Sequence, residues 1–77
     1  MKKVILSEIS IMLAKQWKFN IEKAEHFMNI DFKEMGMLYL DKANDCLDIL
    51  KSNEDISEYK QVNLSDDCTI AYVTWRR

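Results

Sequence analysis

The sequence predicts an α+β fold in which a two-helix hairpin is followed by a C-terminal β-hairpin packed on it. Apolar residues recur every three or four positions over about residues 5–51, a corner motif interrupts them near residue 30, and β-rich runs begin near residue 60. The 77 residues predict a single domain, residues 1–77, with a modest core. Domains this small are often stabilised by a partner subunit.

The first helix is expected over about residues 5–29. Its main apolar row comprises Leu6, Ile9, Leu13, Trp17, Ile21, Ala24 and Met28. A second row consists of Ile5, Met12 and Phe19 and widens the apolar arc to roughly 200°. This arc is wider than contact with a single neighbour requires. We therefore expect the helix to contact more than one neighbour, and we expect a homodimer with Met12 and Phe19 near the contact. A strand over residues 2–6 before a shorter helix starting near Ser7 is the competing interpretation.

The corner is predicted from residues 29–35. Asp31 and Glu34 fit a capping box, in which the two side chains bond each other's backbone N–H groups. Ile30 and Met35 occupy the positions of a hydrophobic staple, and Asn29 can end the preceding helix. The sequence therefore predicts a second helix that begins at Phe32, directly after an Asp31 cap.

The second helix is expected over about residues 32–51, and one side of it is apolar. That side comprises Phe32, Met35, Gly36, Tyr39, Leu40, Ala43, Cys46, Leu47 and Leu50. The small residues Gly36 and Ala43 would allow the first helix to approach closely. A short turn or helix is expected over about residues 53–59, then strands over about residues 60–64 and 69–75. A lone hairpin is marginal in water, so it must pack on the helices or on another chain.

Enzymatic chemistry has little support in the sequence. The chain has one histidine, one glycine and two cysteines, and none of them falls in a metal-binding, phosphate-binding or nucleophile motif. We expect no enzyme activity, no cofactor and no metal. No apolar stretch approaches the ~18 residues of a membrane span, so we expect a cytoplasmic protein without a membrane partner.

The most distinctive feature lies on the back of the second helix. Residues 31–58 carry three Lys and eight Asp or Glu, although the whole chain has a net charge of only -2. Glu34, Asp41, Asp45 and Asp48 fall within an arc of roughly 60° at about 100° per residue. The apolar residues Met37, Leu38 and Ile49 flank this row. The row is either a docking site for a basic partner surface or a solvated helix back. Its apolar flanks are either anchors for a partner or residues buried against the β-hairpin or a second subunit.

These features favour a small, non-enzymatic protein-interaction module. Short chains of this composition are often phage or mobile-element products, so an inhibitor of the anti-defence, anti-CRISPR-like or host-takeover type is one hypothesis. Such an inhibitor would dock the acidic row, with Trp75 as a further contact, on a basic protein surface. The alternative is a small dimeric regulator that binds nucleic acid through its Lys and Arg residues, Arg76 and Arg77 among them, but the scattered lysines make nucleic acid the weaker expectation.

Overall fold

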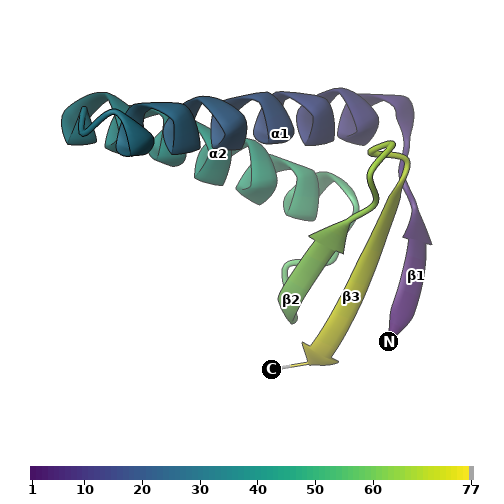
Figure 1. The fold of residues 1–77 in the computed structure, drawn as a ribbon. Coiled ribbons are helices and arrows are strands. Elements are labelled where there is room, and N and C mark those ends of the chain that lie inside the picture. The colour runs from purple at the N-terminus through teal and green to yellow at the C-terminus, as the bar shows by residue number, and fades with distance from the viewer. Residues whose placement is uncertain (77) are drawn as a thin grey trace.

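The computed structural model describes the backbone of residues 1–76 and the side chains of residues 1–74. Its elements are β1 (Lys2–Ile5), α1 (Glu8–Asn29), α2 (Lys33–Asn53), β2 (Tyr59–Leu64) and β3 (Ile70–Arg76). The two helices pack side by side as a long hairpin, and the sheet extends from the open end of that hairpin (Figure 1). The predicted α+β architecture, a helix hairpin followed by a β-hairpin, is confirmed.

The sheet has three antiparallel strands in the order β1-β3-β2, so β3 is central. The predicted β-hairpin supplies β2 and β3, and β1 pairs with the free edge of β3, with Val4 opposite Ala71 and Lys2 opposite Val73. Residues 2–5 are therefore a strand, and the competing interpretation of the N-terminus is the correct one. Residues 54–58 form a turn without a separate helix.

The first helix begins three residues later than predicted because Ser7 ends the strand and caps the helix. Ser7 has an extended backbone (φ -70°, ψ 167°), and its Oγ accepts from the N–H of Ser10 at 3.5 Å. Glu8, in the first turn, suits the positive end of the helix dipole. Cap chemistry thus overrides the continuous apolar pattern that suggested a start near residue 5.

The prediction that Asp31 caps the second helix is wrong. Phe32 occupies the N-cap position and makes no side-chain cap bond, while Asp31 has a φ of 61°. The N–H of Phe32 donates to the Phe27 carbonyl at 2.7 Å, and the N–H of Asp31 donates to the Met28 carbonyl at 3.1 Å. This pair of bonds is a Schellman motif, accompanied by an edge contact between the Phe27 and Phe32 rings. Asp31 therefore ends α1 in the left-handed conformation, the role predicted for Asn29.

Substitution at the corner has a predictable sign. We expect Asp31→Gly to raise the free energy of unfolding by about 0.5 kcal/mol, because glycine adopts a positive φ without strain, and Asp31→Ala to lower it by about 1 kcal/mol. Asn29→Gly is the matched control, and it should be destabilising because Asn29 is helical. Urea unfolding midpoints measure all three, and a loss with Asp31→Gly would contradict the left-handed assignment.

The core lies where the open end of the helix hairpin meets the sheet. Its buried members are Leu6, Ala14, Leu50, Ile56, Tyr59, Cys68, Ala71 and Val73. Farther along the hairpin, small residues lie where the two helices touch. Ala24 and Ala43 are buried, and a Cβ on Gly36 would lie 2.9 Å from Met28 Cε. The predicted close approach at Gly36 and Ala43 is therefore present. The predicted apolar side of α2 is buried or half-buried apart from Phe32.

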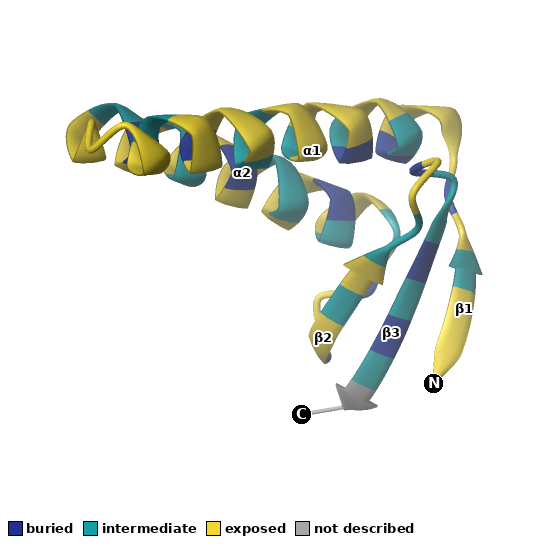
Figure 2. Ribbon diagram, viewed as in Figure 1, coloured by how far each residue is buried: buried dark blue, intermediate teal, exposed yellow. Residues whose placement is uncertain are grey.

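The first helix contacts both α2 and, at its first turns, the sheet, as expected, but its second apolar row is uncovered. Met12 is 58% exposed and Phe19 is 56% exposed, while Ile5 is 78% exposed on β1. Figure 2 shows the exposed side of α1 running along the hairpin, with the sheet reaching only its first turns. The pairing of β1 with β3 holds the sheet at the start of α1, so the sheet cannot fold back along the helix.

Candidate functional site

The carboxylates predicted to form a row are brought together on the outer side of α2. Glu34, Asp41, Asp45 and Asp48 are all exposed. Their helical positions place them opposite the side that packs on α1, and Asp41, Asp45 and Asp48 follow one another at spacings of four and three residues. Neighbouring like charges at these spacings cost a few tenths of a kcal/mol each, so the row is slightly unfavourable for the isolated helix.

The apolar residues beside the row are not covered by the sheet. Met37 is 51% exposed, Leu38 is 47% exposed and Ile49 is 56% exposed. Burial under the β-hairpin, one interpretation of these residues, is thereby excluded. We call the seven residues together the acidic face: Glu34, Met37, Leu38, Asp41, Asp45, Asp48 and Ile49. A surface with large apolar side chains among charges has the composition of a binding patch, with apolar anchors and a polar rim.

A lysine close in sequence to the acidic face is turned toward the flank of α2. Lys42 lies between Asp41 and Asp45 in sequence, but its Nζ is 5.1 Å from the centre of the Tyr39 ring. Tyr39 belongs to the side of α2 that faces α1, where its ring stacks on Phe27. The lysine is thus held by a cation–π contact on the flank of the helix.

A polar cluster that the sequence analysis missed joins the start of α1 to the end of α2. The Glu54 carboxylate accepts from the Ser7 N–H at 3.1 Å and from the Ser7 hydroxyl at 2.9 Å. Asn53 donates from Nδ2 to Ser10 Oγ at 2.9 Å and to Ser7 Oγ at 3.2 Å, and Ser10 is fully buried. The Ser10 hydroxyl is the largest cause of a lowered pKa at Glu54, partial burial opposes it, and the Ser7 bonds add to it.

The loop between β2 and β3 is held by a second hydrogen-bonded carboxylate. Asp67 accepts from the Ser65 hydroxyl at 2.7 Å, from the Thr69 hydroxyl at 2.7 Å and from the Thr69 N–H at 3.2 Å. These bonds, the Ser65 hydroxyl first, lower the pKa of Asp67 to about 2. Cys68 follows with a φ of 62°, and its N–H closes a turn onto the Ser65 carbonyl at 2.9 Å. All three bonds converge on Oδ1 of this carboxylate, which thereby shapes the loop.

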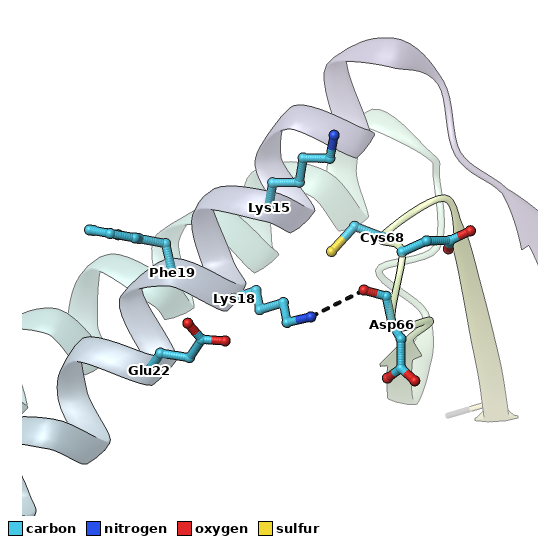
Figure 3. A pocket seen from close by; sticks show the side chains of 7 residues that line it. Lys15, Lys18, Phe19, Glu22, Asp66 and Cys68 are labelled. Atoms are coloured by element: carbon cyan, nitrogen blue, oxygen red, sulfur yellow. Dashed lines mark hydrogen bonds between the residues drawn. The ribbon is translucent and has the colours of Figure 1, made fainter.

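A shallow pocket separates this loop from α1 (Figure 3). Lys18 reaches across it and donates from Nζ to the Asp66 carbonyl at 3.1 Å, while Phe19 points away from the loop. Cys68 lines the pocket but is only 3% exposed. Within the part of the chain that the structure describes, no three His, Cys, Asp or Glu side chains are grouped so as to hold a metal ion. The pocket is best understood as a joint between α1 and the sheet.

Three further observations concern residues named in the sequence analysis. The side chain of Trp75, with Arg76 and Arg77, lies outside the described side chains. Over the described residues, neither helix has an apolar stretch that could cross a membrane. Both cysteines are free: Cys68 is buried, and Cys46 is half-buried beside Gln16 and Asn20 of α1.

The acidic face of α2 is thus the one predicted site whose described members the fold brings together in exposed positions. In comparisons with known proteins, no protein-family model, no curated protein and no solved structure matches the chain.

Proposed function

We propose that the protein is a small, non-enzymatic, cytoplasmic interaction module that docks the acidic face of α2 on a basic surface of another protein. The single observation that carries the proposal is the exposure of Met37, Leu38 and Ile49 beside the carboxylates. A helix back that serves only for solubility has no need of three large apolar side chains among its charges. Basic groups of a partner would meet the carboxylates, and the apolar residues would supply the desolvated contact.

The chemistry of the face suits an inhibitor of a protein that handles nucleic acid. A basic groove that binds phosphates is attracted to a row of carboxylates by the same long-range field. Glu34 and Asp48 are separated by 14 helical residues, so the row extends over about 21 Å at ~1.5 Å per residue. A partner groove of that length would engage the face and lose access to its nucleic acid. The protein would then act as a decoy in an anti-defence or host-takeover role.

Charge reversal on the acidic face tests the proposal. We expect Asp41→Lys, Asp45→Lys and Asp48→Lys, combined in one variant, to weaken capture of the partner by at least tenfold, because like charges would then face each other across the interface. The matched control is Glu22→Lys, Glu25→Lys and Asp66→Lys, which changes the net charge equally on other exposed positions. Tagged wild-type protein and both variants would be used to recover partners from lysate of the source cell or its phage host, with quantification by mass spectrometry.

The same proteins also test the alternative function, a dimeric regulator that binds nucleic acid. We expect no gel shift of double-stranded DNA or RNA by the wild type, and we expect the captured partner to dissociate as salt rises. A wild-type gel shift that is strengthened by the lysine variant and weakened by Arg76→Ala with Arg77→Ala would support the regulator. Equal capture of the same partner by the wild type and the acidic-face variant would overturn the proposed function.

A further inference from the structure

A second uncovered surface runs along α1. Ile9, Met12 and Phe19 are 60%, 58% and 56% exposed. With Gln16 and Lys23 they follow a spacing of three, four, three and four residues, the spacing of a helix seam that packs against another helix. We call these five residues the α1 strip. The α1 strip shares no residue with the acidic face, because all residues of the acidic face belong to α2.

The α1 strip is self-complementary when a second copy is placed antiparallel to it. Met12 and Phe19 are equally distant from the midpoint between Lys15 and Gln16, so an antiparallel pair centred there sets Met12 of each copy against Phe19 of the other. Glu8 and Lys23 are equally distant from the same midpoint. The register that matches the apolar residues therefore also sets each Glu8 opposite a Lys23, twice in the pair.

The geometry of Lys23 suits this arrangement. Its Nζ lies 5.6 Å from the centre of the Phe19 ring, so its aliphatic stem follows the strip. At the other end, Glu8 is exposed in the first turn of the helix. Charges of opposite sign thus stand at the two ends of an apolar centre, and an antiparallel copy of the chain brings them together in this register.

We propose that a second copy of this chain docks antiparallel on the α1 strip and forms a two-fold symmetric dimer centred between Lys15 and Gln16. The proposal goes beyond the docking role of the acidic face and stands without it. The dimer leaves α2 of each copy unused, so a dimeric protein carries two acidic faces. Two faces on one particle raise the affinity for a partner that has repeated basic sites, without any new contact.

Sedimentation velocity from 1 to 100 µM tests the dimer with purified full-length protein, and these concentrations cover about 1 to 100 times the Kd of a micromolar interface. We expect the wild type to dimerise within this range and Phe19→Asp to weaken the dimer at least tenfold, because it places a charge in the apolar centre. Ile49→Asp is the matched control, since Ile49 on α2 is as exposed as Phe19, at 56% for each residue. Circular dichroism confirms that both variants remain folded.

The ends of the strip test the register. Glu8→Lys and Lys23→Glu should each weaken the dimer about threefold or more, and the double variant should restore it, because the exchanged charges again face each other. A wild type that is monomeric at 100 µM, or a dimer that Ile49→Asp disrupts as strongly as Phe19→Asp, would overturn the proposal. Failure of the double variant to restore the dimer would overturn the antiparallel register.

Discussion

Leu50→Ala is expected to lower the free energy of unfolding by about 3 kcal/mol, within the ~2–5 kcal/mol typical of a buried leucine. Leu50 is completely buried and belongs to the cluster that joins the last turns of α2 to the sheet. Truncation removes the apolar contact area and leaves a cavity between elements that are fixed by backbone hydrogen bonds on both sides. For a domain of this size, whose total stability is of the order of 4–12 kcal/mol, the loss is a large fraction.

The neighbouring residue supplies the control for Leu50. Ile49→Ala removes a side chain of the same size from the same helix, but Ile49 is 56% exposed. Its effect should stay within about 0.5 kcal/mol, as for other surface substitutions. Equal losses from the two variants in urea unfolding would mean that the outer side of α2 is buried in solution, which would contradict both the core and the exposure of the acidic face.

Helical periodicity predicted the two helices and the inner side of α2 correctly. Gly36 and Ala43 were identified from their spacing alone, because residues seven apart lie on one helix side and small ones permit close contact. The helix ends were harder to predict, since Asp is favoured both at an N-cap and in the left-handed conformation. Asp31 fits the sequence pattern of an N-cap, but in the structure it adopts the left-handed conformation.

The position of the sheet depends on contacts that local pattern does not contain. Strand β1 pairs with β3, more than 60 residues away in the chain. The pattern of residues 2–5 does not indicate which strand they pair with. The pairing holds the sheet at one end of the hairpin and leaves Met12 and Phe19 uncovered. The wide apolar arc of the first helix was therefore identified from the sequence, but local pattern could not show that the sheet leaves its second row exposed.

The acidic face was predicted better than the rest of the surface because every described member lies on one helix. Exposure of Asp41, Asp45 and Asp48 follows from their position opposite the core side. The cluster around Ser10 was missed because its members come from two regions more than 40 residues apart. A serine inside an apolar helical row was the available signal, since a buried hydroxyl needs a hydrogen-bond partner.

The cluster that Ser10 joins predicts the second large effect. Ser10→Ala is expected to lower the free energy of unfolding by about 2 kcal/mol, because it removes a fully buried hydroxyl that bonds the Asn53 amide and favours the charged form of Glu54. The Asn53 amide loses its 2.9 Å bond, and Glu54 loses the hydroxyl that contributes most to its lowered pKa. Ser52→Ala, at an exposed position of α2, is the control and should change stability by less than about 0.5 kcal/mol.

The pH dependence of the same variant separates this cause from a simple packing defect. The pKa of Glu54 in the folded protein lies below its ordinary value of 4.5, so its carboxylate stabilises the fold above that pH and the contribution is lost as the pH falls through the folded pKa. Removal of the Ser10 hydroxyl should raise that pKa toward 4.5, so the difference between wild type and Ser10→Ala should shrink in acid. Asp67, with its pKa near 2, destabilises both proteins alike at low pH and cancels in the difference. Urea unfolding at pH 7 and pH 3.5 measures the effect, and a difference that is the same at both values would show that Glu54 does not respond to Ser10.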